Sequence, residues 1–314
     1  MADPGLRIGT RASALALWQA RHVQGILRQH GVEAELVEIT TTGDKILDVP
    51  LADIGDKALF TKELDVALIE NRIDIAVHSL KDLPTTLPDG IVLCAVSDRE
   101  DPTDAFVPHP SFSGTMADLP FGATLATSSL RRSAQLKAWR DDLRIVSVRG
   151  NVNTRLQKLD ASDWEGMILA SAGLIRLGMA ERIGEPIDHS IMLPAVSQGV
   201  LGVVGRREDR GVFDAVRSCV HHLDTEKRIE AERAFLRRLE GGCSVPVGAH
   251  AVLRDGMLTV EGVVASLDGS SYFRGTAEGV PDDAGALGVS LAEELLARGA
   301  GDVLRRIKKK LPSS

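Results

Sequence analysis

The amino-acid sequence predicts an α/β protein built from two larger α/β domains and a small α+β domain at the C-terminal end. The chain has 314 residues, which exceeds one typical domain. Over its first two hundred residues, short apolar runs alternate with amphipathic stretches, as strands and helices do in α/β domains. The last third instead has one long amphipathic helix, then successive strand-like segments. We therefore expect a change of fold class late in the chain.

The first predicted domain follows from apolar residues at strand and helix spacing. Its expected elements are a strand at 6–9, a helix after Ser13, a strand at 35–39, a helix at 62–71 capped by Thr61, and strands at 73–77 and 91–96. The hydroxyl of Ser13 is expected to cap its helix by accepting a bond from a free N–H of the first turn. Residues 40–57 have no steady period, and we interpret them as a long loop of the kind that often forms a lid.

The second predicted domain begins after Asp101-Pro102 and repeats a strand-to-helix pattern three times. We expect strands at 123–126, 144–148 and 167–170, and helices at 130–139, at 152–159 and in a short stretch that ends near Gly178. Residues 194–205 are interpreted as a crossing segment and one more strand, LGVVG, which returns to the first domain.

The third predicted domain starts with a helix at 225–240, which Gly241-Gly242 ends. Strands follow at 247–253, 258–264 and 272–275, with Asp268-Gly269 as a turn. A helix at 287–297 and a basic tail, RRIKKK, close the chain, and we interpret the tail as a solvated helix end. The predicted domains are 1–99 with 198–217, 103–194, and 218–314.

Composition and charge exclude several function classes. With 37 basic and 44 acidic residues the net charge is -7, which offers no general attraction to nucleic acid or to an anionic membrane. No run approaches the roughly 18 apolar residues of a membrane span, and no signal peptide is visible. Cys94, Cys219 and Cys243 are odd in number and widely spaced. This spacing excludes a disulfide framework and a CxxC metal site and favours a cytoplasmic location, and we expect no bound metal.

Hydroxyl-bearing and cationic residues gather where the predicted strands lead into helices. They are Arg11 and Ser13; Ser79 and Lys81; Ser128, Ser129, Arg131 and Arg132; Arg149 and Arg155; and Ser171 and Arg176. Ligands of open α/β sheets lie beyond the carboxyl ends of strands, where helix N-termini offer free N–H groups. Neighbouring guanidinium groups repel by up to ~4 kcal/mol at 4 Å and a dielectric constant near 20, so the cluster favours an anionic ligand. A polycarboxylate and a phosphorylated ligand both fit, and a solvated surface explains any single arginine.

Two further residues are candidates for chemistry. Asp82 follows a strand end, where its carboxylate can exchange protons or stabilise a cation, although a surface ion pair or a helix cap explains it too. Cys243 follows two glycines, which favours an accessible thiol, whereas Cys94 lies within a strand and is interpreted as buried and inert. A proton-carrying role fits His78, although a histidine at a strand end is more often structural, and His221-His222 is a weak metal signal.

These residues lie in stretches that resemble the porphobilinogen deaminase (hydroxymethylbilane synthase) family over most of the chain. The stretches are LRIGTRASALALWQA, TTGDKILD, LFTKEL, DIAVHSLKDLPT, TSSLRRSAQL, VRGNVNTRLQKLD, ILASAGLIRLG, LPAVSQG and AERAFLRRLEGGCSVPVGAH. The resemblance implies two domains like periplasmic binding proteins and a small C-terminal domain. It also implies a monomeric cytoplasmic transferase that condenses four porphobilinogen molecules into the linear tetrapyrrole hydroxymethylbilane. Ser197 stands where the family commonly has glycine.

The resemblance also implies roles for individual residues. Cys243 would hold a dipyrromethane cofactor through a thioether, and Asp82 would be the catalytic carboxylate. Cofactor binding falls on Lys81, Thr127, Ser128, Ser129, Arg131, Arg132 and Arg155. Substrate binding falls on Arg11, Ser13, Lys57, Phe60, Arg149, Arg176 and Gln198. Each pyrrole carries an acetate and a propionate, so the growing chain is a polyanion that needs many arginines.

Two other function classes are alternatives to the deaminase. A non-catalytic anion-binding or ligand-sensing protein would share the fold, but no signal peptide or helix-turn-helix segment is visible and Cys243 has no use in it. A different cytosolic thiol enzyme acting on phosphorylated substrates would need a phosphate-binding loop, whose signature the sequence lacks.

Overall fold

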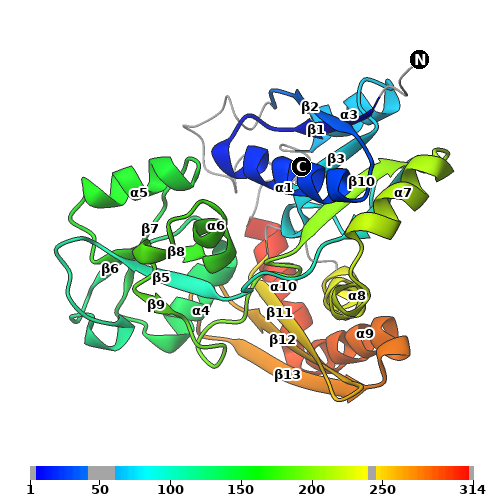
Figure 1. Cartoon of the computed structure of the whole chain (residues 1–314). Helices are drawn as coiled ribbons and strands as arrows, with labels where there is room; N and C mark the ends of the chain where they lie inside the picture. The colour runs from blue at the N-terminus through cyan, green and yellow to red at the C-terminus, as the bar shows by residue number, and fades with distance from the viewer. Residues whose placement is uncertain (1–4, 42–60, 240–244, 311–314) are drawn as a thin grey trace. The chain divides into compact units, whose positions relative to one another are not determined.

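The structure is a computed structural model that describes residues 5–41, 61–239 and 245–310 (Figure 1). The chain forms two compact units. One comprises the described residues up to Glu100 together with Gly199–Glu226, and the other comprises Asp101–Gln198 and the described residues from Lys227 onward. The described residues form three sheets, two of them mixed and one antiparallel. The predicted class of two α/β domains and a small α+β domain is confirmed.

The first unit is a five-stranded sheet in the order β2-β1-β3-β10-β4, with β10 antiparallel to both of its neighbours. Its elements are β1 Leu6–Thr10, α1 Ala14–Gln29, β2 Ala34–Glu38, α3 Lys62–Ile69, β3 Ile75–Ser79, the 3-10 helix η3 Leu80–Asp82, β4 Ile91–Val96, β10 Leu201–Arg206 and α7 Arg210–Val220. The predicted return of LGVVG to this sheet is confirmed as β10. Helix α7, which the sequence analysis did not predict, packs Val216 beside Val23 of α1 over the sheet. The predicted loop at 40–57 lies almost wholly outside the described residues.

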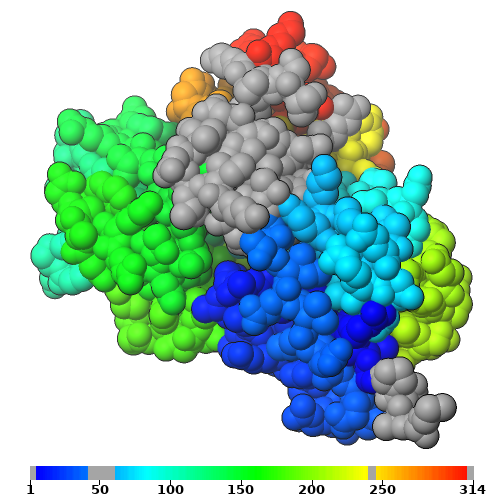
Figure 2. All heavy atoms as spheres, turned by 90° about the horizontal axis from the view of Figure 1, so that it is seen from above, coloured from blue at the N-terminus to red at the C-terminus, as the bar shows by residue number. Residues whose placement is uncertain are grey.

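The first half of the second unit is a sheet of the same design, in the order β7-β6-β8-β5-β9. Its elements are β5 Asp104–Pro108, β6 Thr124–Ala126, α4 Leu130–Trp139, β7 Arg144–Val146, α5 Val152–Asp160, β8 Gly166–Ala170, α6 Ser171–Arg176 and β9 Glu185–Pro186. Strand β5 runs antiparallel to β8. It was not predicted, because the aspartate and the proline at its ends are residues typical of loops. Figure 2 shows part of this half of the unit, drawn in green, at the visible surface.

The second half of that unit is a three-stranded antiparallel sheet covered by helices. Its elements are α8 Leu223–Arg238, whose first turn up to Glu226 belongs to the first unit, β11 Val247–Arg254, β12 Met257–Ala265, β13 Tyr272–Gly279, α9 Ala284–Leu295 and α10 Gly301–Lys310. The predicted turn at Asp268-Gly269 is confirmed, with Gly269 at φ 74. The interpretation of the tail as a solvated helix end is wrong in part. Helix α10 buries Val303, Leu304 and Ile307 in the same core as Phe235 of α8, because its apolar residues recur at helical spacing.

The chain passes from the second unit to the first between Gln198 and Gly199, and a strained serine lies just before this point. Ser197 has φ 65 and is fully buried. Its N–H donates to Glu232 Oε2 at 2.7 Å, whereas its hydroxyl has no hydrogen-bond partner among the described residues. Glycine adopts this left-handed backbone freely, whereas a serine is strained in it.

We expect Ser197→Gly to raise the free energy of unfolding by about 1 kcal/mol. The left-handed backbone costs a non-glycine residue of order 1–3 kcal/mol, which glycine avoids. Glycine is also more flexible in the unfolded chain, and this lowers the stability gained by about 0.5–1 kcal/mol. Urea unfolding measures the difference. Ser197→Ala removes the unpaired hydroxyl but keeps the strain, so it should gain less. An alanine variant as stable as the glycine variant would show that relief of the strain is no larger than the cost of glycine's freedom in the unfolded chain, which would contradict the expected gain.

Candidate active site

In the first unit, polar groups lie at the carboxyl ends of the neighbouring parallel strands β1 and β3. Ser13 caps α1, as predicted, with its Oγ accepting from the N–H of Ala16 at 3.3 Å. Gln19 of α1 is almost fully buried and its Nε2 donates to Ser79 Oγ at 2.8 Å. The helix is thereby tied to the end of β3. By contrast, Thr61 precedes α3 but makes no side-chain cap.

The short helix η3 presents Lys81 and Asp82 on a buried base. Leu80 and Leu83, which flank them, are 0% and 4% exposed. Gly202 of β10 leaves room for Leu80, because a Cβ there would lie 2.8 Å from its Cδ1. Asp82 is exposed, and no residue that the structure describes donates a hydrogen bond to its carboxylate. The buried leucines fix the backbone of η3, and the Asp82 carboxylate on it is exposed to solvent.

His78 lies inside the sheet beside this site. It is 6% exposed, and its Nε2 has no hydrogen-bond partner among the residues described. Burial, and then the charge of Arg11, lower the pKa of the imidazole from 6.5 to about 4. The histidine is therefore neutral near pH 7, which agrees with its interpretation as a structural residue.

The lowered pKa of His78 predicts a loss of stability in acid. Between pH 6.5 and 4 the unfolded chain binds a proton that the folded chain does not, so the free energy of unfolding should fall as the pH falls. The full effect, reached near pH 4, is about 3 kcal/mol. Urea unfolding at pH 7 and pH 4.5 should show a smaller difference for His78→Gln than for the wild type. The exposed His30, changed to Gln, is the control, and equal acid sensitivity of all three proteins would contradict the expectation.

In the second unit, hydroxyl groups lie between β6 and α4. The Oγ of Ser129 caps α4, accepting from the N–H of Arg132 at 3.5 Å, and Thr127 Oγ1 accepts from the N–H of Ser129 at 3.2 Å. Ser128 Oγ donates to the carbonyl of Val148 at 2.6 Å and accepts from the N–H of the same residue at 3.0 Å. The turn is thus built from its own side chains and from the neighbouring strand end.

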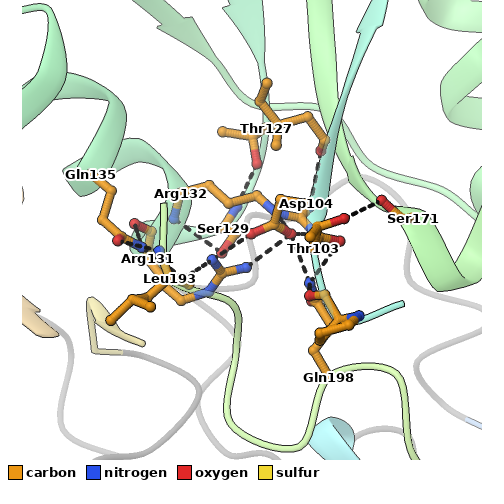
Figure 3. A network of polar contacts seen from close by, with 12 residues as sticks. Thr103, Asp104, Thr127, Ser129, Arg131, Arg132, Gln135, Ser171, Leu193 and Gln198 are labelled. Carbon is orange, nitrogen blue, oxygen red and sulfur yellow. Dashed lines mark hydrogen bonds and ion pairs between the residues drawn. The ribbon is translucent and has the colours of Figure 1, made fainter. Parts of the chain in front are cut away.

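Arg131 and Arg132 converge on one buried carboxylate, that of Asp104 (Figure 3). Asp104 is 0% exposed and the two arginines are 5% and 6% exposed. Arg131 Nη1 lies 2.6 Å from Asp104 Oδ2, and Arg132 Nε lies 2.9 Å from Asp104 Oδ1. Gln198, whose Nε2 donates to Asp104 Oδ1 at 3.0 Å, completes the network. Two cations therefore share a single anion in a site almost closed to water.

The ionisation of Asp104 follows from these neighbours. Burial alone would raise the pKa of the Asp104 carboxyl, but the guanidinium groups of Arg131 and Arg132 hold it well below its ordinary value. Burial lowers the pKa of Arg132, an effect that Asp104 opposes. The three groups are charged at neutral pH, and one positive charge is left over.

The remaining predicted residues of this unit differ in how they are held. Arg149 is half-buried, and its guanidinium contacts no acceptor among the described residues. Arg155, in the first turn of α5, donates from Nε to the carbonyl of Gly150 at 2.8 Å. Arg176 is 8% exposed at the end of α6, and Gln198 is 1% exposed, with its amide directed to Asp104 and the carbonyl of Pro102. Lys57, Phe60 and Cys243 lie outside the described residues.

Sequence reasoning missed Asp104 and Gln19. Asp104 opens an otherwise apolar run, DAFV, and a lone acid at the start of a buried strand was the available signal. Gln19 had no comparable signal, because nothing along the chain relates it to Ser79, sixty residues away. The interpretation of Cys94 as buried is confirmed, and burial raises the pKa of its thiol to about 12.

The part of the chain that the structure describes has no metal site of the usual kind. There, no three histidine, cysteine, aspartate or glutamate side chains are placed to hold a metal ion together. His221 instead contacts Glu226 at 3.1 Å, and His222 Nδ1 accepts from the N–H of Thr225 at 3.2 Å. None of the described helices is both long and apolar enough to cross a membrane.

Comparison with known families matches nearly the whole chain. The family profile described as "Porphobilinogen deaminase, dipyromethane cofactor binding domain" matches residues 6–214, and that described as "Porphobilinogen deaminase, C-terminal domain" matches residues 227–297. The first match covers both sheets on which the candidate residues lie.

Individual relatives give the same result. The porphobilinogen deaminase of Desulforudis audaxviator is 52% identical over 303 residues, covering 96% of this chain and 97% of the relative. That of Moorella thermoacetica is 50% identical over 305 residues, covering 96% of each. Among solved structures, the methionine-binding protein MetQ overlaps 69% of this chain and 90% of its own, with a TM-score of 0.45 and 13% identity.

Proposed function

Because this chain belongs to the porphobilinogen deaminase family, it is a transferase of tetrapyrrole biosynthesis, and we propose that Asp82 and the arginines at the strand ends carry out its reaction. The substrate is porphobilinogen, whose acetate and propionate groups are anionic and whose aminomethyl group leaves as ammonia. The observation that supports this assignment best is the surplus positive charge of Arg131 and Arg132 on a single buried carboxylate.

The residues of the second unit fit a dipyrromethane cofactor. Such a group carries several carboxylates, and the turn at 127–129 with Arg131, Arg132 and Arg155 offers hydroxyl and guanidinium donors. Guanidinium groups bind carboxylates in a forked, charge-assisted geometry. When bound, the cofactor supplies the pyrrole carbon to which the first substrate unit is joined. We propose that Cys243 holds it through a thioether.

Asp82 is proposed as the catalytic residue. When the C–N bond of the aminomethyl group breaks, ammonia leaves and a positive charge develops on the substrate pyrrole. The carboxylate of Asp82 is exposed and accepts no hydrogen bond from a described residue. It can therefore stabilise that charge and accept a hydrogen bond from the pyrrole N–H. A C–C bond then forms between the substrate and the accepting pyrrole carbon. Asp82 acts as the base that accepts the ring proton released from that carbon. Repetition gives a chain of four units, hydroxymethylbilane, after hydrolysis.

Substrate carboxylates are assigned to Arg11, Ser13, Lys57, Arg149, Arg176 and Gln198, with Phe60 packing near the pyrroles and Lys81 among the cofactor contacts. Of these, Arg149 has the strongest support, because its guanidinium makes no contact with a described acceptor. The three-domain division at 1–99 with 198–217, 103–194 and 218–314 is part of the proposal, as are a monomeric state and a cytoplasmic location.

The experiment that tests this function is incubation of the purified protein with porphobilinogen, with ammonia and linear tetrapyrrole measured together. We expect four ammonia molecules for each tetrapyrrole released. Binding of porphobilinogen without release of ammonia would instead support the non-catalytic anion-binding alternative.

A further inference from the structure

We propose that Asp104 is a positioning residue, which holds the guanidinium groups of Arg131 and Arg132 in the orientation and with the net charge that an anionic ligand needs. The inference rests on the proposed function, because it takes the ligand to be the carboxylates of the pyrrole cofactor. Asp104 acts through the two arginines and does not itself touch the ligand.

The position of Asp104 supports an indirect role. As the first residue of β5 it pairs with Ala170, the last residue of β8, so it lies at the edge of the sheet where β8 ends. Its side chain is 0% exposed. Oδ2 accepts from Arg131, and Oδ1 accepts from Arg132 and from Gln198. A carboxylate so enclosed by its own neighbours has no face left for a ligand.

Each arginine is fixed at a second point by a backbone carbonyl. Arg131 Nη1 donates to Leu193 O at 2.7 Å, and Arg132 Nη1 donates to Ile168 O at 2.9 Å. Figure 3 shows both guanidinium groups reaching Asp104 from α4, with Gln198 approaching from another side. Two fixed points define the plane of a guanidinium group. A guanidinium has five N–H donors, and these contacts leave donors on each arginine that no described residue accepts.

Charge gives Asp104 its second effect. With the aspartate ionised, the trio carries one net positive charge, which a ligand carboxylate can neutralise. With a neutral residue at 104, the two guanidinium groups would face each other without a counter-charge in a site almost closed to water. Their repulsion would rotate them away from the orientation that the ligand needs. Loss of the charge should therefore impair ligand capture beyond any effect on folding.

The first unit offers a matched control. Asp74 also lies between two arginines, with Arg7 Nη2 at 2.8 Å and Arg206 Nη2 at 3.1 Å from its Oδ1. It precedes β3, whereas Ser79 is the last residue of that strand and Asp82 follows it, so Asp74 lies at the opposite edge of its sheet. Asp74→Asn therefore breaks a comparable ion-pair cluster at a place with no candidate ligand residue.

The experiment follows cofactor acquisition. The wild type, Asp104→Asn and Asp74→Asn are produced in a host that cannot make porphobilinogen, and porphobilinogen is then added. Intact mass measures the fraction of chains that carry two pyrrole units against time, and thermal unfolding measures stability. We expect both variants to lose stability, but only Asp104→Asn to acquire the adduct more slowly, by about tenfold or more.

Acquisition by Asp104→Asn at the wild-type rate, or equal slowing in Asp74→Asn, would overturn the inference. If Asp104→Asn does not fold, Asp104→Glu keeps the charge and shifts the carboxylate by one methylene, with Asp74→Glu as its control. Slower acquisition in Asp104→Glu alone supports the inference, and a wild-type rate overturns it. If even the wild type acquires no adduct, the proposed function fails and this inference fails with it.

Discussion

Asp82→Asn is expected to fold normally and to lose turnover of porphobilinogen by at least about a hundredfold. The substitution keeps the size of the side chain but removes the negative charge and the capacity to accept a proton. Asp82 is exposed and accepts no hydrogen bond from a described residue, so its removal leaves no buried group unpaired. The free energy of unfolding should stay within about 0.5 kcal/mol of the wild type. Steady-state release of ammonia and urea unfolding are the measurements.

The control for this variant is Asp89→Asn. Asp89 is also exposed and lies seven residues further along the chain, between η3 and β4. It should keep full turnover. Because the variant Asp82→Asn retains the thiol and the arginines, it should still carry the pyrrole adduct. Turnover near the wild-type rate would remove Asp82 from the mechanism, whereas loss of turnover with loss of folding would assign it a structural role.

Arg149→Ala is expected to lower kcat/KM for porphobilinogen by roughly 10- to 100-fold. A hydrogen bond to a charged group contributes about 1.5–3 kcal/mol, which corresponds to that range. The guanidinium of Arg149 makes no contact with a described acceptor, so stability should hardly change. Its backbone carbonyl, which accepts from Lys158 Nζ at 3.1 Å, is retained in alanine. Initial rates at varied porphobilinogen concentration measure the effect.

Arg144→Ala is the matched control for Arg149. Arg144 is exposed at the first residue of β7, whereas Arg149 follows the end of that strand. Removing a surface arginine there should leave kcat/KM unchanged. Equal losses in both variants would indicate a general electrostatic effect on an anionic substrate, and an unchanged Arg149→Ala would remove this residue from the substrate contacts.

The features that the sequence predicted well are those decided by near neighbours in the chain. The Ser13 cap depends on an N–H three residues away, and the strand-to-helix junctions follow from local apolar spacing. The neighbouring positions of Arg131 and Arg132 follow for the same reason, because both residues lie in the first turn of the predicted helix after the strand at 123–126. Helix α7 was missed, although its Val216 and Val220 are buried against the first sheet.

What the sequence did not reveal depends on contacts between distant residues. The sequence predicts that Arg131 binds the ligand. Its partner Asp104, however, lies 27 residues earlier, on a strand that the sequence did not predict. Nothing local marks that carboxylate as the group that orients the two arginines. Similarly, the burial that keeps His78 neutral arises from the assembled sheet. The roles of Lys57, Phe60 and Cys243 still come from the family resemblance, since these residues lie outside the described part of the chain.

The most direct test of the account is the intact mass of the protein purified from a host that makes porphobilinogen, followed by peptide mapping. The account predicts that the mass exceeds that of the chain by two pyrrole units and that the added mass maps to the peptide containing Cys243. Cys243→Ala should lack the addition. An unmodified chain, or an adduct on any other residue, would contradict the assignment of Cys243 as the point of cofactor attachment.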